Sequence, residues 1–252
     1  MKNDQRDAED LADLYRLGRL AEAWVAPPEV RQLRELVRYR AKLVALRSGL
    51  KAQAHAVLAK EGVAVPVTDL FGTAGQKFLD DVPLAAAYRA RIESLRGLIS
   101  TIEREVAIFE RDLERELGGV PGYQAIQKIA GVGPVIAAIF VAEIGDVTRF
   151  ASPRHLASWA GLTPRHRESD TSVHRGPITK QGSRLVRWAV VEAAQRQAAG
   201  TKLRADYARI AENHGSSPGA RKIARVAVAR KIVTLVYYGL RDGEIRSLES
   251  AP

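Results

Sequence analysis

Two long stretches without proline constrain the fold of this chain more than any other feature. One runs from Val30 to about Lys60, and the other runs from about Leu84 to Leu117. Between them, the segment from Gly62 to Pro83 contains two prolines and three glycines. Because proline breaks a helix and glycine weakens it, each stretch is expected to form one long helix, with the segment between them as the connection.

Apolar residues recur in both stretches at the a and d positions of a heptad. In the first stretch, where Gln53 is the one polar d position, they are Leu36, Tyr39, Leu43, Leu46, Leu50 and Val57. In the second stretch they are Ile92, Leu95, Ile99, Ile102, Val106, Phe109 and Leu113, with charged residues between them. Three such heptads give a seam on the order of 30 Å long, which a supercoiled pair of helices buries. We expect an antiparallel hairpin, either packed within one domain or projecting as a dimerising coiled coil, and the flanking charges favour the coiled coil.

Caps and breakers predict shorter helices elsewhere, so the chain is expected to be mainly α. A short helix should run from Asp7 to Leu17, before a Pro-Pro linker. Four further helices are expected at Pro134 to Gly145, Ser152 to Gly161, Ser183 to Ala199 and Arg221 to Tyr238. The segment Leu162 to Gly182 reads as a polar loop, and the only strand candidates, which are weak, lie at Gly62 to Val67. These elements divide the chain into residues 1–28, 29–118 and 119–252.

The composition narrows the classes of partner. The net charge is +10, and 29 of the 39 basic residues are arginines, whose planar fork pairs with phosphate through two hydrogen bonds. This bias favours nucleic acid as the partner, although a GC-rich genome would enrich arginine whatever the function. The lack of cysteine excludes disulfides, thiolate metal sites and cysteine nucleophiles. The acidic start is unlike a signal peptide, and the apolar runs are too short to span a bilayer, so we expect a cytoplasmic, nucleoid-associated protein with no membrane partner.

The segment IAGVGPVIA, which contains Gly131 and Gly133, fits a helix-hairpin-helix element. One helix would end near Ala130, the glycines would form the turn, and a second helix would begin at Pro134. Glycine permits left-handed backbone angles and lets a phosphate approach, while the free N–H groups at the helix start point toward that phosphate. Such contacts hold DNA without reading its sequence. A dinucleotide-binding loop would need a preceding strand and a third glycine, whereas a tight turn between core helices remains an alternative.

Basic residues are concentrated in the segment after this element. Arg165, Arg167, Arg175, Lys180, Arg184 and Arg187 are opposed there only by Glu168 and Asp170. The segment also offers Ser169, Ser172, Thr171, His166 and His174 as a nucleophile, proton shuttles or phosphate ligands. Composition alone leaves open whether this is a nucleic-acid site or a solvated surface.

Several of these motifs resemble one known family. The run from Ile126 through Ala194, with AGVGP, WAGLTP, RGPITKQGSRLVRW and VEAA, is similar to the C-terminal domain of the insertion sequence 110 family of transposases, also called the IS116/IS110/IS902 group. The opening KNDQRDAEDLADL resembles the Lys-Thr/Asn-Asp-x-x-Asp-Ala motif that ends the RuvC-like nuclease domain of that family. The heptad hairpin falls where the family has a coiled coil, so the resemblance covers nearly the whole chain.

The resemblance implies DNA recombination guided by a structured RNA, within a homo-oligomer (a dimer or tetramer). In that family four carboxylates bind divalent metal, expected to be Mg2+, and a serine attacks the DNA backbone. Matched by position, Asp4 and Asp7 correspond to the last two carboxylates, and Ser169 corresponds to the serine. Carboxylates at i and i+3 share one helix face, as a magnesium site of oxygen ligands requires. Without the resemblance, both aspartates would read as N-terminal helix caps.

Two departures from the family pattern produce two hypotheses. The first two carboxylates would lie before Met1, so most of the RuvC-like domain is expected to be missing, and Asp170 follows the serine where the family has glycine. A carboxylate there would repel the scissile phosphodiester unless it is turned away or neutralised. The chain is therefore expected to be a truncated or decayed transposase, or else a non-catalytic nucleic-acid-binding protein that dimerises. The DNA just upstream of the start codon would discriminate between them.

Overall fold

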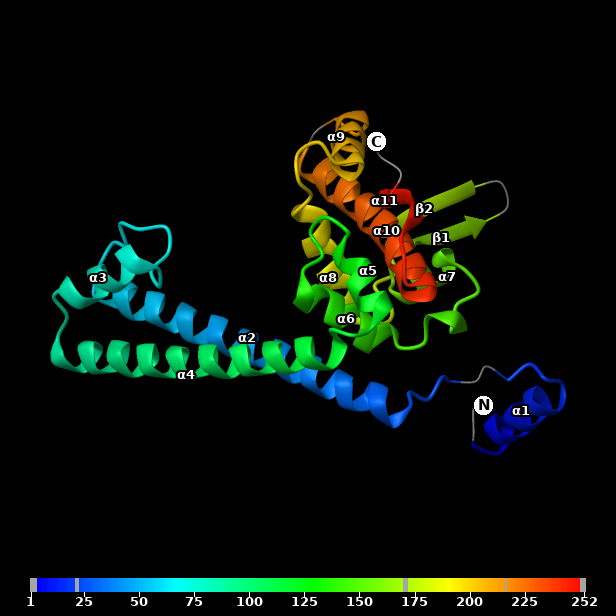
Figure 1. The fold of residues 1–252 in the computed structure, drawn as a ribbon, viewed down its shortest axis with the longest axis horizontal. Coiled ribbons are helices and arrows are strands. Elements are labelled where there is room, and N and C mark those ends of the chain that lie inside the picture. The colour runs from blue at the N-terminus through cyan, green and yellow to red at the C-terminus, as the bar shows by residue number, and fades with distance from the viewer. Residues whose placement is uncertain (1–3, 21–22, 170–171, 216, 250–252) are drawn as a thin grey trace.

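The computed structural model describes residues 4–20, 23–169, 172–215 and 217–249, and within them all side chains except those of 166–169, 172–175 and 248–249. The described chain is mainly helical, as predicted, and it has three parts along the sequence (Figure 1). The helix α1 (Asp4–Arg16) lies near the N-terminus and buries none of its residues. A long pair of helices follows, and a compact helical part completes the chain.

The helices α2 (Pro28–Lys60) and α4 (Ala86–Leu117) lie side by side in an antiparallel hairpin (Figure 1). The rings of Tyr39 and Phe109 meet edge-on, with centroids 5.0 Å apart. Further along, the guanidinium of Arg47 lies 3.6 Å from the carboxylate of Glu103. Residue numbers therefore rise along one helix as they fall along the other, so the two helices run antiparallel.

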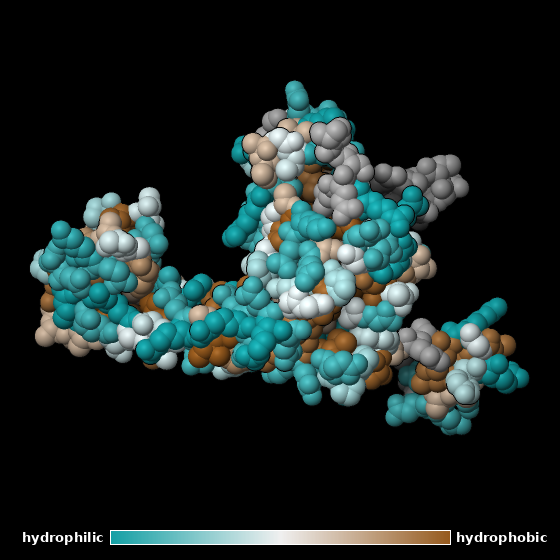
Figure 2. Space-filling view, viewed as in Figure 1, coloured by the Kyte–Doolittle hydropathy of each residue, from teal (hydrophilic) through white to brown (hydrophobic). Residues whose placement is uncertain are grey.

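The predicted seam is buried only in part on α4, where Ile102 and Phe109 are half-buried, and it differs further on α2. On α4 the residues Ile92, Leu95, Ile99, Val106 and Leu113 are buried. On α2, by contrast, Tyr39 is 43% exposed and Leu46 is 56% exposed. The buried positions of α2 are Leu33, Val37, Leu43, Ala54, Val57 and Leu58. In the middle of the hairpin the side chains of Arg40, Arg47 and Lys51 are 14%, 30% and 32% exposed, and they form ion pairs with Glu110 and Glu103 of α4. Figure 2 shows the resulting surface, with hydrophobic patches between hydrophilic side chains along the hairpin.

The far end of the hairpin has a small core of its own. The helix α3 (Thr73–Asp81) lies within the predicted connection, and Leu70 and Leu79 pack there against the ends of α2 and α4. The weak strand prediction for residues 62–67 is wrong, because these residues form no strand. The prolines prevent long helices in this segment, but they leave room for the two turns of α3.

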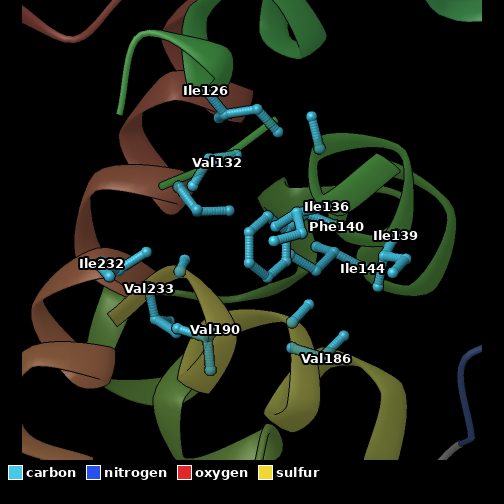
Figure 3. Packing of buried hydrophobic residues seen from close by; sticks show 14 of the residues in the cluster. Ile126, Val132, Ile136, Ile139, Phe140, Ile144, Val186, Val190, Ile232 and Val233 are labelled. Carbon is cyan, nitrogen blue, oxygen red and sulfur yellow. The ribbon is translucent and has the colours of Figure 1, made fainter. Parts of the chain in front are cut away.

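The compact part contains the main core of the described chain. Its helices are α5 (Pro121–Gln127), α6 (Pro134–Ile144), α7 (Pro153–Trp159), α8 (Arg184–Gln195), α9 (Lys202–Asn213), α10 (Pro218–Asp242) and α11 (Arg246–Glu249), with a 3-10 turn at Val147–Arg149. The central helix α6 is buried on nearly every side, and Phe140 is fully enclosed. Side chains of α5, α6, α8 and α10 turn toward one another around it (Figure 3). The first turns of α2 also join this core through Leu33 and Val37.

Side-chain caps explain where three of these helices begin. The hydroxyl oxygens of Ser183, Thr201 and Ser217 each accept a hydrogen bond from a backbone N–H three residues later, at 3.1 to 3.3 Å. These bonds satisfy donors that the first turn of a helix leaves without partners. The helices predicted in this part are confirmed, and α9 and α11 were not predicted.

The predicted polar loop from Leu162 to Gly182 is wrong. It contains the strands β1 (Pro164–Ser169) and β2 (Ser172–Ile178), which pair antiparallel from Pro164 with Ile178 to Ser169 with Ser172. The register shifts by one residue between Pro164 and His166. The pair forms a two-stranded ribbon that projects from the compact part (Figure 1). In the part of the chain that the structure describes, no helix is long and apolar enough to cross a membrane.

Candidate nucleic-acid interface

The two glycines of the α5–α6 turn have different structural roles. Gly131 has a φ of +82°, and a Cβ there would lie 2.5 Å from the carbonyl oxygen of Ala193 on α8. The turn therefore packs so closely on α8 that no side chain fits at Gly131. A packing role was the alternative that the sequence left open, and the geometry at Gly131 agrees with it.

Gly133, by contrast, faces open space. It precedes α6 with φ −85° and ψ 178°, an extended conformation that any residue adopts, and no atom lies within 4 Å of the position of its Cβ. Its carbonyl oxygen accepts the first hydrogen bond of α6, from the N–H of Ala137 at 2.9 Å. The N-terminus of α6, with its partial positive charge, is therefore accessible at Gly133.

A hollow of about 300 Å³ opens beside this turn, and we call it the turn hollow. Its lining includes Gly131, Gly133, Trp188 and two arginines, Arg40 and Arg196. Trp188 is 47% exposed, so its ring is available to a ligand. Arg40 pairs with Glu110 across the hairpin, and Arg196 lies 3.6 Å from Glu192. The turn hollow thus combines a helix N-terminus, an exposed aromatic ring and two guanidinium groups.

The residues at the base of the β ribbon are held firmly by Arg187. Its guanidinium donates hydrogen bonds to the carbonyl oxygens of Ala160 at 3.1 Å, Gly182 at 3.2 Å and Gln181. Burial, followed by the neighbouring charge of Arg184, lowers the pKa of Arg187 from its ordinary value. Arg187 therefore fixes the path of the chain into α8, and its predicted role as a phosphate ligand stays a prediction.

A second hollow, of about 420 Å³, lies at the N-terminus of α8, and we call it the Glu143 hollow. Its lining consists of Arg34, Arg38, Glu143, Trp159, Ser183, Arg184 and Leu185. Arg184, one of the predicted phosphate ligands, is exposed there. The hollow lies between the start of α2, the end of α6 and the start of α8, three segments that are far apart in the sequence.

The buried carboxylate of Glu143 organises this second hollow. Arg38 donates to both of its oxygens, at 2.7 and 3.1 Å, and the Ser183 hydroxyl donates to Oε2 at 3.0 Å. The hydrogen bond to Glu143 raises the pKa of Arg38. Because a buried charge is stable only when it is paired, this network ties α2 to α6 and α8. Arg34 strengthens the same junction by donating to the carbonyl oxygens of Ala142 and Glu143 at the end of α6.

The linker before α2 is fastened to this junction by cation–π contacts. The guanidinium of Arg149 lies 4.4 Å from the ring centroid of Trp24 and 5.1 Å from that of Trp159. Burial is the largest cause of a lowered pKa for Arg149. These stacked groups position the start of α2 beside the Glu143 hollow.

The other predicted ligands lie on the β ribbon and at its base. Arg165 is exposed on β1, and Lys180 is exposed after β2 with a left-handed φ of 58°. The side chains of Arg167, Arg175 and Ser169 lie outside the described residues, as does Asp170 altogether. Only the backbone of Ser169 is placed, at the end of β1 and paired with Ser172. The structure thus brings Arg184 and Arg187 together at the start of α8, while Gly131 and Gly133 line the turn hollow.

The two predicted metal ligands lie apart from both hollows. Asp4 and Asp7 occupy the first turn of α1, which buries no side chain. Across the described residues, no group of three or more histidine and acidic side chains is placed to hold a metal ion. Magnesium prefers six oxygen ligands in a tight octahedron. The described residues therefore do not form a Mg2+ site.

Sequence reasoning missed the Glu143 network, although a signal was present. Glu143 is a single acid in the apolar run VIAAIFVAEIG. A lone charge inside a run that must be buried requires a partner, and this requirement points toward a basic residue on a neighbouring element. The identity of that residue, Arg38, could not be read from the sequence because it lies 105 residues away.

Two family models of transposases match parts of the chain. A family model described as "Transposase IS116/IS110/IS902 family" matches residues 123–208, and a second, the DEDD-type IS110 model described as "Transposase", matches residues 1–61. The first match spans the α5–α6 turn, the β ribbon and α8. It therefore includes most of the lining of both hollows.

Curated relatives agree with these models. A "Probable family 20 transposase" of Pseudomonas aeruginosa is 26% identical over 200 residues, covering 77% of this chain and 59% of the relative. The "Transposase for insertion sequence element IS1111A" of Coxiella burnetii is 25% identical over 203 residues, covering 77% and 54%. A "Pilin gene-inverting protein" of Moraxella bovis is 32% identical over 120 residues, covering 45% and 35%. The chain thus spans about half the length of the curated relatives that it matches.

Proposed function

Because the chain belongs to the IS116/IS110/IS902 family of transposases, we propose that it takes part in DNA transposition or site-specific recombination. In this proposal the compact part, residues 119–252, binds the phosphate backbone of DNA. The observation that carries the proposal is that the family match over residues 123–208 coincides with two hollows lined by arginines. Arginine forks and an accessible helix N-terminus are groups that hold phosphates.

The two hollows would contribute different contacts. In the Glu143 hollow, Arg184 is exposed and free to reach a phosphate, while Arg38 is oriented by Glu143. In the turn hollow, the open face of Gly133 lets a phosphate approach the N-terminus of α6, and Trp188 offers a flat apolar surface. Backbone contacts of this kind position a protein on DNA without selecting a sequence.

We assign the role of nucleophile to Ser169 on the basis of the family resemblance. In the proposed step its hydroxyl loses a proton to solvent and its oxygen bonds to the phosphorus of a DNA phosphodiester. The bond from phosphorus to the departing sugar oxygen then breaks, and that oxygen takes up a proton. A phosphodiester resists attack until its charge is neutralised, and the exposed Arg165 and Lys180 lie at the base of the same ribbon.

Further copies of the chain and a structured RNA are the partners in this proposal. The exposed Leu46 and Leu98 of the hairpin, 56% and 51% exposed, support its role as a coiled coil that joins copies of the chain. A structured guide RNA is proposed from the family resemblance, and the net charge of +10 suits such a partner.

Salt-dependent binding tests the DNA-binding proposal. We expect the affinity for a 30-base-pair duplex, measured by fluorescence anisotropy, to fall with a log–log slope of about −4 against salt if roughly four phosphates are contacted. Arg184→Gln should reduce the slope by about 1 for every sequence tested. Arg115→Gln, at an exposed arginine on α4, is the matched control and should leave the slope unchanged. Tight binding that ignores salt would contradict the proposal.

Adduct formation tests the serine. In a system that supplies a RuvC-like domain and a cognate guide RNA, we expect a covalent protein–DNA adduct that Ser169→Ala abolishes and Ser172→Ala leaves intact. An adduct that survives Ser169→Ala would overturn the assignment.

A second candidate function is a non-catalytic nucleic-acid-binding protein that dimerises. The observation that favours it is that no group of three or more histidine and acidic side chains is placed to hold a metal ion in the part of the chain that the structure describes. Salt-dependent DNA binding without any adduct, in the presence of the supplied domain and RNA, would support this function over the first.

A further inference from the structure

We infer that a groove between α7 and α10 holds one backbone phosphate of a nucleic acid between two arginines, Arg154 of α7 and Arg230 of α10. The inference rests on the proposed nucleic-acid-binding function and adds a site that shares no lining residue with the Glu143 hollow or the turn hollow. We call this site the α10 groove, and its volume is about 310 Å³. It extends beyond the family match over residues 123–208, because Arg230 belongs to the later helix α10.

The α10 groove lies where α7 packs against α10 (Figure 1). Besides the two arginines, its lining consists of Pro153, Ala157, Ala227, Lys231 and Thr234. Ala157 is buried and Ala227 is half-buried. Because these side chains are small, the space between the two helices is left unfilled, and a ligand can lie against the helix surfaces there.

The charges of the two arginines are not neutralised. Arg154 and Arg230 are both exposed, and within the described residues no acidic side chain lines the groove or pairs with either of them. Neither helix could supply such a partner locally, because α7 has no acidic residue and α10 has none before Asp242. By contrast, the exposed Arg16 and Arg115 each pair with an aspartate three residues earlier. Two like charges that share one space repel each other, so an anion between them is stabilising.

Lys231 adds no available charge to the groove. Its ammonium group pairs with the carboxylate of Asp206 on α9, which Arg209 also contacts. The hydrogen bond from Lys231 is the largest cause of the lowered pKa of Asp206, so this carboxylate is ionised and engaged. The charge that a ligand can reach is therefore that of Arg154 and Arg230.

The dimensions of the groove suit one phosphate group. A sphere of about its volume is roughly 8 Å across, which is the gap that a phosphate needs between two guanidinium groups at a hydrogen-bond distance of about 2.8 Å on each side. The planar fork of arginine matches the geometry of phosphate oxygens. A carboxylate of an acidic protein would also accept such hydrogen bonds, but the membership of the chain in a transposase family favours a phosphate.

The lining of the groove also indicates which part of the nucleic acid it contacts. No aromatic side chain is among the described residues that line it, so an unpaired base would find no ring on which to stack. The ligand is therefore the backbone, and the contact holds the nucleic acid without reading its sequence.

Salt-dependent binding of a labelled 30-base-pair duplex by the full chain tests the inference, because the slope counts the phosphates that are neutralised. Arg154→Gln or Arg230→Gln alone should lower the affinity roughly ten-fold. Either single variant should leave the log–log slope nearly unchanged, because the other guanidinium still neutralises the phosphate. The double variant should reduce the slope by about 1. Arg16→Gln with Arg115→Gln, which removes two exposed arginine charges elsewhere, is the matched control and should leave affinity and slope unchanged.

A variant that changes no charge separates the groove from the net charge of the protein. Ala227→Leu should fill the floor of the groove and exclude the phosphate, so it should reduce the slope by about 1, as the double arginine variant does. Leucine is a good helix former, so α10 should persist, and circular dichroism checks this. Ala208→Leu, at an exposed alanine of α9 outside the groove, is the matched control. A normal slope in a folded Ala227→Leu protein would contradict the site.

Three further probes identify the source of the phosphate. An RNA hairpin of equal charge is compared with the duplex, and the nucleic acid whose slope falls in the double arginine variant is the one that the groove binds. Inorganic phosphate at millimolar concentration and constant ionic strength should not displace the duplex, because free phosphate lacks the neighbouring contacts. Displacement by inorganic phosphate would overturn the inference. So would binding of a polyglutamate peptide that depends on both arginines as strongly as duplex binding does.

The double arginine variant also gives the decisive negative results. Unchanged affinity and slope would overturn the inference, and so would a reduction of the slope by about 2, because that result means two separate phosphates. If Arg184→Gln still reduces the slope in either case, the proposed function stands and only this inference fails. Binding by the wild-type chain that ignores salt would instead contradict the proposed function.

Discussion

Replacing Gly131 with alanine is expected to destabilise the protein by about 2–5 kcal/mol. The left-handed φ of +82° costs an L-residue about 1–2 kcal/mol. The new Cβ would also lie 2.5 Å from the carbonyl oxygen of Ala193, so α8 must move away, and such overpacking costs about 1–3 kcal/mol. The movement would disturb a second bond as well, because the same oxygen accepts from Gln197 Nε2.

Gly133→Ala is the matched control for stability. The new Cβ meets open space, and the backbone is already in an extended conformation. Alanine is a poorer N-cap than glycine, but it lowers the entropy of the unfolded chain, and these effects are of similar size. We therefore expect the free energy of unfolding to change by less than about 1 kcal/mol.

Urea unfolding followed by circular dichroism at 222 nm measures both variants. For a chain of this length, the expected loss at Gly131 corresponds to a drop of about 10 °C in Tm. Under the proposed function, Gly133→Ala should weaken binding to every duplex alike while the fold stays intact. An unchanged free energy of unfolding for Gly131→Ala would refute the packing argument, and unchanged DNA affinity for Gly133→Ala would refute the phosphate approach there.

Three further predictions concern the hairpin, acid stability and metal. Ile99→Lys with Ile102→Lys should place charges in the α2–α4 seam and disrupt any assembly through it, so light scattering should show a smaller particle than the wild-type oligomer. A wild-type monomer at high concentration would mean that the hairpin packs only on itself. Because the pKa of Asp206 is lower in the folded than in the unfolded chain, the stabilisation that its carboxylate provides is present above pH about 4 and is lost as the pH falls through its folded pKa. The free energy of unfolding of Asp206→Asn should therefore decrease less steeply with falling pH than that of the wild type, and identical pH dependence of the two would contradict this. Asp4 and Asp7 should bind Mg2+ only weakly by calorimetry, and micromolar binding that Asp4→Asn abolishes would show that α1 belongs to a complete site.

The sequence predicted those helices that begin and end with strong signals. Pro134 and Gly145 bound α6 as expected, and a serine cap marks the start of α8. The short helix α9 was missed, although Thr201 caps it and Leu203, Tyr207 and Ala211 follow at helical spacing. Its high content of charged residues resembles a loop, and only packing against α10 distinguishes it.

The β ribbon could not be predicted because a two-stranded ribbon has no need of an apolar face. Strands are recognised by alternating apolar and polar residues, and that pattern arises only where one face is buried. β1 reads PRHRES, which shows no such alternation. The ribbon is specified instead by backbone pairing and by its anchored base, where Lys180 N–H donates to the carbonyl of Gly161 at 3.1 Å.

The candidate site was predicted in part. The basic segment and the glycine turn directed attention to the correct region, but the sequence could not separate Gly131, which packs, from Gly133, which is open. Nor could it show that Arg187 holds backbone carbonyls while Arg184 faces solvent. Those distinctions depend on contacts between residues that are distant in the chain, and a local pattern carries no information about them.

Because the two ends of α2 are packed in different cores, a small rotation at one end of the hairpin displaces the other end by a larger distance. Leu33 and Val37 at its start are buried in the main core, whereas its other end lies in the separate small core around α3. A helix of 33 residues is about 50 Å long, so a tilt of about 5° at the core moves the far end by about 4 Å. Conversely, a partner that holds the far end sets the angle of the compact part, and with it the direction in which the β ribbon points.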